Sequence, residues 1–255
     1  MTAGRLCLLV TLALGALGPA GSWAADPAAP PPSPEPGRVR LSLRGALGGG
    51  IQFDQVRTFT EFAEAGRLES RYENGAGPGF EAGLSWRIGR RFAVSAAAGA
   101  LRRKGTGSFS ASLPHPLVFG AAREAEGRFE GSTERETALH LDLAVLASAG
   151  RLEWSAFAGP SLIRVDADLV RAVEYAHAYP YDAVTVTGTP LASARGSAAG
   201  FNVGAGLDWR VSRRLALGTQ ARFSRARVTL RPGVDDVVEV DAGGFQVAAG
   251  LRVDF

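Results

Sequence analysis

The chain has 255 residues, of which 46% are hydrophobic and 21% are charged, and 28 Lys and Arg residues against 25 Asp and Glu residues give a formal net charge of +3. The basic residues are scattered along the chain, which excludes the concentrated positive patch of a nucleic-acid-binding protein. Because the only cysteine is Cys7, disulfides, zinc–cysteine clusters and cysteine nucleophiles are excluded from the rest of the chain.

Residues 1–24 have the order of a secretory signal peptide. The basic residue Arg5 precedes an apolar run, and the small residues Ser22 and Ala24 follow it at the spacing of a cleavage site. A membrane anchor is the alternative, but a spanning helix needs about 18 to 20 apolar residues, and Pro19 interrupts this run earlier. We expect Sec-type export and cleavage after Ala24.

Residues 25–37 are rich in proline and carry no bulky apolar side chain. Such a segment cannot pack against a core, so we predict an extended periplasmic linker. No second break in composition follows, and residues 38–255 are therefore predicted to form one domain.

Alternation of apolar and polar residues dominates this domain. The clearest case is the C-terminus, where apolar residues from Phe245 to Phe255 alternate with polar or small ones, and 80–88 and 201–211 repeat the pattern. Taken along the chain, the alternation predicts eight strands, at 38–51, 78–88, 92–105, 133–147, 152–165, 198–211, 215–225 and 242–255.

The predicted connections fall into two classes. Three are short turns at 89–91, 148–151 and 212–214, and four are long polar links at 52–77, 106–132, 166–198 and 226–240. The strands of a soluble sandwich also alternate apolar and polar residues, but that fold gives no reason for short and long connections to alternate along the chain. We therefore predict an all-β fold, an eight-stranded antiparallel up-and-down transmembrane β-barrel with three short periplasmic turns and four long extracellular loops.

Aromatic residues support this interpretation. Trp86, Trp154 and Trp209 each lie three residues from a tight turn on the apolar face, as an aromatic girdle at one membrane boundary requires. The far ends of the same faces carry a candidate second girdle, consisting of Phe80, Phe201 and Phe245. Packing in a soluble core is the alternative explanation.

The opposite, inward face carries charge. It consists of Arg40, Arg44, Arg87, Arg210, Arg222 and Arg252 together with Glu81, Asp142, Glu153, Asp208 and Asp254. Because an eight-stranded barrel is just wide enough for its side chains to fill it, we expect an internal ion-pair network and a filled lumen.

His140 and Asp142 lie two residues apart on one face and could belong to a hydrolytic triad. An enzyme that modifies membrane lipid would turn its nucleophile and base toward the outer leaflet, whereas His140 has inward parity. No Gly-x-Ser-x-Gly elbow, phosphate loop or paired-His metal motif occurs. We predict no catalytic, cofactor-binding or metal-binding residues, and we assign both side chains to the polar network.

All four tyrosines fall in the predicted long loops. Tyr72 lies in the first, and Tyr175, Tyr179 and Tyr181 lie in the third together with His177. Exposed aromatic loops are plausible contact surfaces for an extracellular ligand. Alternatively, these residues extend the strands above the membrane, and the sequence leaves both interpretations open.

Several segments resemble the outer-membrane β-barrel domain family, whose members are often labelled porin-family proteins. They are PGFEAGLSWRIGRRFAVSAAAGALRRKG at 78–105, LHLDLAVLASAGRLEWSAFAGPSL at 139–162, GFNVGAGLDWRVSRRLALGTQARFS at 200–224 and the terminal FQVAAGLRVDF. Where many relatives have a tyrosine in the third strand, this chain has Ala100 or Leu101.

The resemblance implies an integral protein of the Gram-negative outer membrane, in contact with lipid and lipopolysaccharide. It also implies that the barrel assembly machinery recognises the last strand, which ends at Phe255. It assigns no catalytic residue. We expect a non-enzymatic protein with a structural or surface-interaction role, and the alternatives are a small channel, a lipid-modifying enzyme and a soluble periplasmic barrel.

Overall fold

The computed structural model describes residues 39–232 and 237–255. The predicted signal peptide, 1–24, and the predicted linker, 25–37, lie outside the described residues. Within the described ranges no helix is long and apolar enough to cross a membrane. The twelve strands there are β1 (Val39–Gly48), β2 (Ile51–Glu61), β3 (Glu64–Asn74), β4 (Gly77–Ile88), β5 (Phe92–Pro114), β6 (Ala122–Ala149), β7 (Leu152–Val170), β8 (Glu174–His177), β9 (Val184–Gly188), β10 (Leu191–Arg210), β11 (Leu215–Leu230) and β12 (Val238–Asp254).

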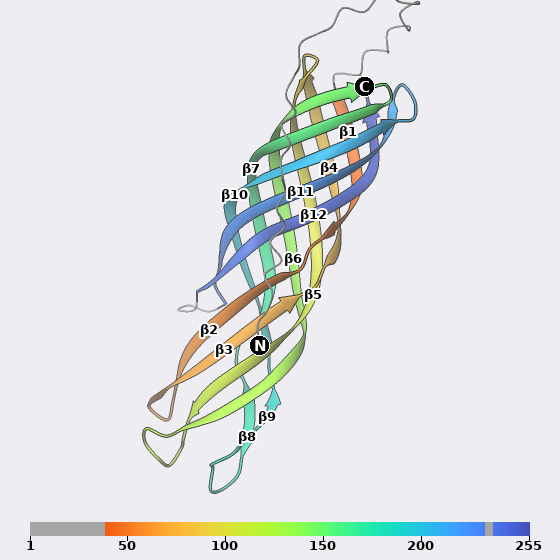
Figure 1. The fold of residues 1–255 in the computed structure, drawn as a ribbon. Helices are drawn as coiled ribbons and strands as arrows, with labels where there is room; N and C mark the ends of the chain where they lie inside the picture. Colours follow the sequence, from red (N-terminus) through yellow and green to blue (C-terminus); the bar gives the residue numbers. More distant parts are fainter. Residues whose placement is uncertain (1–38, 233–236) are drawn as a thin grey trace, which may run out of the picture. The chain divides into compact units, whose positions relative to one another are not determined.

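Eight of these strands pair into a closed antiparallel ring (Figure 1). The order is β1, β4, β5, β6, β7, β10, β11 and β12, and β12 pairs again with β1. Each segment predicted to be a strand overlaps one strand of the ring. Closure leaves the ring without an unpaired backbone edge.

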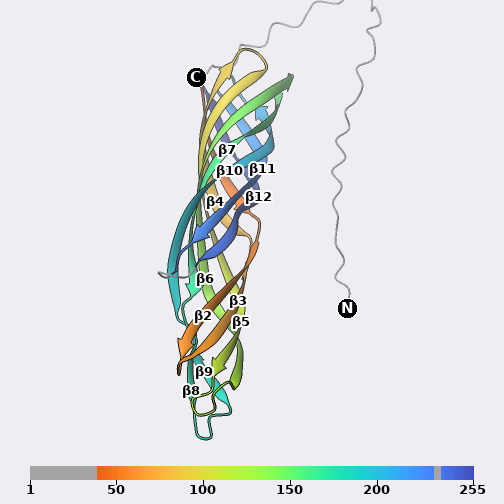
Figure 2. The same ribbon diagram turned by 90° about the vertical axis from the view of Figure 1, so that its left-hand side faces the viewer.

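Three tight turns join neighbouring strands of the ring, as predicted. One of them, between β6 and β7, consists of Gly150 and Arg151, and Gly150 has the positive φ of 60° that such a turn needs. The turn after β4 likewise contains Gly89 with φ at 71°. The ends that these turns connect lie near the C-terminus in both views (Figures 1 and 2).

The four segments predicted to be long polar loops consist largely of β-strands. Residues 52–77 form most of the β2–β3 hairpin, and β3 pairs with the distal part of β5. Residues 106–132 are largely continuations of β5 and β6, while 166–198 include the end of β7, the start of β10 and the separate β8–β9 sheet. Residues 226–240 include the ends of β11 and β12, and 233–236 lie outside the described residues.

These strand segments were missed because, along a single strand, the exposed residues change from apolar to charged. We call this change the reversal of faces. On β11, Leu217 and Phe223 are exposed, and two and four residues beyond Phe223 the exposed positions become Arg225 and Arg227. The inward positions change in the opposite sense, from the polar Arg222 to apolar residues that are completely buried. A strand with polar outward residues looks like a loop when only apolar outward residues are counted.

The distal ends of the strands therefore enclose a hydrophobic core, which we call the outer core. It includes Phe53, Tyr72, Phe109, Phe129, Ile163, Val165, Leu169, Val228, Leu230 and Val240. These residues come from β2, β3, β5, β6, β7, β11 and β12, so the β2–β3 hairpin forms part of its wall (Figure 1).

One glycine determines which residues of the distal part of β6 are buried and which are exposed. The β5–β6 ladder shifts register between Gly105 and Thr106, whose partners are Ser132 and Glu130, so Gly131 is the extra residue of a β-bulge. Gly131 has φ at 83°, which glycine adopts without strain. Because of this extra residue, buried positions change from even numbers to odd numbers, and Phe129 faces the outer core.

Candidate functional site

Glu153, on β7 beside a tight turn, is the centre of a buried group of charges. Its carboxylate accepts hydrogen bonds from Arg40 at 2.6 and 3.0 Å, from Arg87 at 2.5 Å, from Arg210 at 3.0 Å and from Arg252 at 2.9 Å. These arginines belong to β1, β4, β10 and β12, whose inward positions meet Glu153 inside the ring. Only 1% of Glu153 is exposed.

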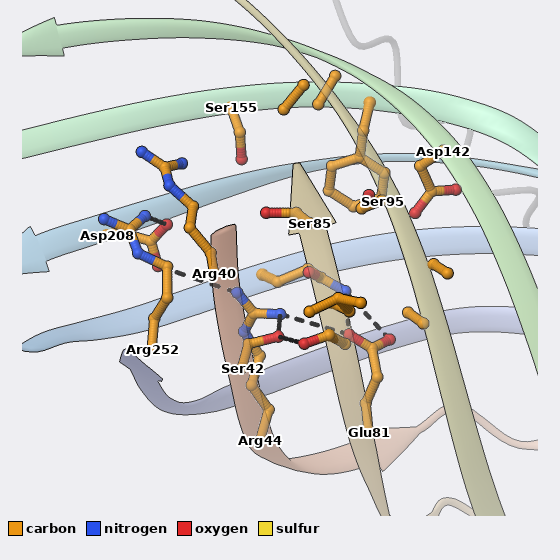
Figure 3. Close-up of a pocket in the computed structure, with 18 of the residues that line it drawn as sticks. Arg40, Ser42, Arg44, Glu81, Ser85, Ser95, Asp142, Ser155, Asp208 and Arg252 are labelled. Carbon is orange, nitrogen blue, oxygen red and sulfur yellow. Dashed lines mark hydrogen bonds and ion pairs between the residues drawn. The ribbon is translucent and has the colours of Figure 1, made fainter. Parts of the chain in front are cut away.

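A second group of ion pairs continues along the interior (Figure 3). Arg44 lies 3.9 Å from Asp208 and 3.4 Å from Glu81. Arg222 in turn joins Glu81, at 3.4 Å, to Asp142, at 3.2 Å. The network thereby reaches from the Glu153 group toward the outer core.

Arg252 links the two groups, because it contacts Glu153 at 2.9 Å and Asp208 at 2.5 Å. It also contacts Asp254 at 2.9 Å, and Asp254 lies 3.7 Å from Arg40. All eleven charged side chains predicted to face inward thus belong to one continuous network, and that prediction is confirmed. We call these eleven residues the inner network.

Little space remains among these side chains. The cavity beside them, into which Ser42, Ser95 and Ser155 also project, has a volume of about 80 Å³ (Figure 3). Sites for small molecules usually have roughly 300 to 1,000 Å³. The inner network therefore fills this part of the barrel rather than surrounding a binding pocket.

His140 does not form a triad with Asp142. Its Nδ1 lies 2.7 Å from the Ser161 hydroxyl, which also accepts a hydrogen bond from Asn202 at 3.0 Å, whereas Asp142 pairs with Arg222. Arg222 also donates to the side-chain oxygen of Asn202 at 3.0 Å. His140 is thus joined through these hydrogen bonds to the inner network, as predicted, and it is buried there.

A second buried ion-pair layer was not predicted. Arg103 is 1% exposed and contacts Glu134 at 2.9 Å and Glu136 at 3.0 Å, and Glu134 also accepts a hydrogen bond from Asn74 at 2.6 Å. Arg103 also donates to the carbonyl of Gly243 at 3.1 Å. Its inward parity could be read from the sequence, because Arg103 shares the parity of Ser95, opposite to the apolar outward residues Phe92 and Val94 of the same strand.

Tyr72 closes the interior beyond this layer. Its ring stacks on Phe53 with centroids 4.5 Å apart and meets Phe129 edge-on at 5.1 Å. Its hydroxyl donates to Gln55 at 2.7 Å and accepts from the backbone NH of Val170 at 2.7 Å, and burial raises the pKa of Tyr72 to about 12. Tyr72 lies on β3 and is completely buried, so of the two interpretations left open by the sequence, strand extension holds for this residue and the exposed contact loop does not.

The remaining loop aromatics lie near the β8–β9 hairpin. Tyr179 is 81% exposed, whereas Tyr175 donates a hydrogen bond to Glu61 at 2.6 Å. The rings of His177 and Tyr181 meet at 5.1 Å. Tyr175 and His177 lie on β8, which fits the interpretation that these residues extend the strands. Tyr179 is exposed, which fits the interpretation of an exposed aromatic loop.

The interior is therefore filled in three successive ways: by the inner network, by the Arg103 layer and by the outer core. Within 39–232 and 237–255, no group of His, Cys, Asp or Glu has the arrangement of a metal site.

No family model matches the chain, and no curated protein sequence matches it. The chain does match solved structures. The chain is similar to Neisserial surface protein A, with 13% identity, a TM-score of 0.41 and coverage of 84% of this chain and 97% of that one. It is similar to the outer membrane protease OmpT from Escherichia coli, with 10% identity, a TM-score of 0.42 and coverage of 87% and 98%. A major outer membrane protein from Thermus thermophilus gives 10% identity, a TM-score of 0.44 and coverage of 85% and 99%.

Proposed function

We propose that the chain is a non-enzymatic integral protein of the outer membrane whose barrel is filled and whose strands project outward as a rigid interaction surface. The observation that carries this proposal is the reversal of faces along single strands. Below the reversal, outward residues are apolar and inward residues are charged, which suits lipid outside. Above it, outward residues are charged and inward residues are apolar, which suits water outside.

The reversal occurs at the same level on neighbouring strands. On β7 the outward residues change from Leu162 to Arg164, and on β10, paired with β7, they change from Phe201 to Arg195 within six residues. The apolar band extends from these positions to the tryptophans. With a strand tilt near 40°, the eight residues from Phe201 to Trp209 span roughly 20 Å along the membrane normal, close to the apolar height of such barrels.

Both predicted girdles lie on the outside of this band. Trp86, Trp154 and Trp209 are 51% to 62% exposed, and Phe80, Phe201 and Phe245 are 52% to 59% exposed. A soluble periplasmic barrel would have no reason to expose such large rings at both limits of an apolar band. This pattern supports a membrane location over the soluble alternative.

The interaction role rests on the distal hairpin tips. Leu117, Val118 and Phe119, between β5 and β6, are 65%, 54% and 87% exposed. The turn that carries them is fixed, because Nδ1 of His115 accepts hydrogen bonds from the backbone NH groups of Leu117 and Val118 at 3.1 and 3.0 Å. Exposed apolar residues on a fixed turn are typical of protein contact surfaces.

Cysteine labelling on intact cells tests both location and orientation. A Phe119→Cys variant should react with a membrane-impermeant maleimide, whereas Arg90→Cys, at the turn between β4 and β5, should react only after the outer membrane is permeabilised. The native Cys7 lies in the predicted signal peptide, so each mature variant would carry a single thiol. Equal labelling of the two variants on intact cells would refute the proposed orientation.

The interaction role has a separate test. Cells that display the wild-type protein should be retained on an octyl-derivatised matrix, and a Leu117→Ser/Phe119→Ser variant should lose this retention. A Ser108→Thr/Thr229→Ser variant, changed at outward polar positions of β5 and β11, is the control. Equal retention of all three at equal surface amounts would contradict the assignment of the tip as the contact surface.

A further inference from the structure

The outer core contains a second and larger cavity, with a volume of about 270 Å³. Its apolar walls are Phe59 on β2, Leu68 on β3, Ala111 and Leu113 on β5, and Val173 after β7. The charged residues Arg57, Glu61 and Arg171 also line it. An apolar cavity of about 150 Å³ holds benzene. The present cavity is therefore large enough for a molecule of more than one ring, and it approaches the lower limit of small-molecule sites.

The segment after β7 that covers this cavity is tied on two sides. Tyr175 donates a hydrogen bond from its hydroxyl to Oε1 of Glu61 at 2.6 Å, and Arg57 donates to the backbone carbonyl of Arg171. One residue earlier, the NH of Val170 donates to the buried Tyr72 hydroxyl. The cavity is consequently preformed by fixed strands and a fixed connection, so little ordering would be required when a ligand binds.

Glu61 places one carboxylate at the edge of this apolar cavity. Tyr175 occupies Oε1, and burial together with this hydrogen bond raises the pKa of Tyr175 to about 12, so the hydroxyl stays protonated at neutral pH. Within the described part of the chain, no hydrogen bond to Oε2 of Glu61 is formed. A carboxylate oxygen accepts a hydrogen bond from a proton donor, which favours a ligand with a hydroxyl group.

We propose that this cavity binds a small molecule with a compact apolar body and a hydroxyl group, which donates a hydrogen bond to Oε2 of Glu61. The apolar body lies against Phe59, Leu68 and Leu113. This site is separate from the hairpin tips, and it stands or falls independently of the interaction role proposed above.

Equilibrium dialysis of the full-length protein in detergent, with 1-naphthol as the probe and equal detergent in both chambers, tests the proposal. Wild-type protein should bind one 1-naphthol in excess of the detergent background. Naphthalene, which lacks the hydroxyl, should bind about tenfold more weakly, because a hydrogen bond to a charged group is lost.

Variants locate the site. Val173→Trp fills the cavity from the covering segment and should abolish binding of 1-naphthol, whereas Val56→Trp, at a 53% exposed position on the other face of β2, should leave it unchanged. Glu61→Gln should weaken the binding of 1-naphthol and leave the binding of naphthalene unchanged. The heat-dependent gel shift of each variant establishes that it is folded.

Two results would overturn the proposal. Equal uptake by wild type and a folded Val173→Trp variant would show that the probe enters detergent or another site. Binding of naphthalene as strong as that of 1-naphthol would show that Glu61 does not select the ligand.

Discussion

Replacing Glu153 by Gln should destabilise the barrel by about 3 to 5 kcal/mol, the cost of breaking a buried ion pair by removing one partner. The carboxylate accepts five hydrogen bonds from four arginines, at 2.5 to 3.0 Å. After the change, Arg40 keeps Asp254 and Arg252 keeps Asp208 and Asp254. Among the described residues, Glu153 is the carboxylate partner of Arg87 and Arg210, so these two lose their neutralising charge.

Urea unfolding of the detergent-solubilised barrel, followed by its heat-dependent gel mobility and tryptophan fluorescence, measures this free energy. The matched control is Glu69→Gln, which breaks the exposed ion pair with Arg67 and should cost at most about 1 kcal/mol. If Glu153→Gln and Glu69→Gln shift the unfolding midpoint equally, the inner network does not contribute to stability in the way its geometry indicates.

Four further predictions follow from the same structure. Leu141→Arg, at a 53% exposed position of the apolar band, should cost about 2 to 4 kcal/mol in lipid, whereas Thr229→Arg beyond the band should be neutral, as bilayer refolding titrations would measure. Gly131→Ala should lower stability by about 1 to 2 kcal/mol through its positive φ alone, since nothing lies within 4 Å of the added Cβ; an unchanged midpoint would mean that the bulge is not under this constraint. Because the pKa of Tyr72 is raised to about 12 from 10, its stabilisation is complete below pH 10 and lost as the pH rises to 12; alkaline unfolding should therefore be shallower in Tyr72→Phe, which would itself be about 1 to 3 kcal/mol less stable at neutral pH. Planar-bilayer recordings should show no conductance for the wild type or for Arg44→Ala/Glu81→Ala, because the Arg103 layer and the outer core lie in series with the inner network; discrete openings of the wild type would favour the channel alternative.

The strands and the inner network could be predicted from the sequence because alternation is a local property. Trp209 and Arg210, adjacent in the chain, necessarily point to opposite faces, and the same holds for Leu251 and Arg252. Once lipid was assigned to the apolar face, the eleven charges of the inner network followed, whereas the buried Arg103, Glu134 and Glu136 were missed. The ion pairs themselves could not be predicted, since Arg40 and Glu153 are 113 residues apart.

The outer core escaped prediction because the residues on the outside of it are polar. On β7 the outward residues become Arg164, which is exposed, and Asp166, which is partly exposed. A search for apolar outward faces therefore ends there, although Val165 and Leu169 continue the strand. The cavity beside Glu61 was beyond reach for another reason. Its walls come from β2, β3, β5 and the segment after β7, which only long-range strand pairing brings together.

Gly131 determines which residues of the distal β6 segment face inward and which face outward. All residues from Ala122 to Glu130 owe their orientation to one supernumerary position, so deleting it would turn Phe129 toward water and Glu130 toward the outer core. Length changes in this segment should consequently be tolerated in steps of two residues and rejected in steps of one. Variation among natural versions of the projecting strands would then occur in even increments, with odd ones confined to the hairpin turns.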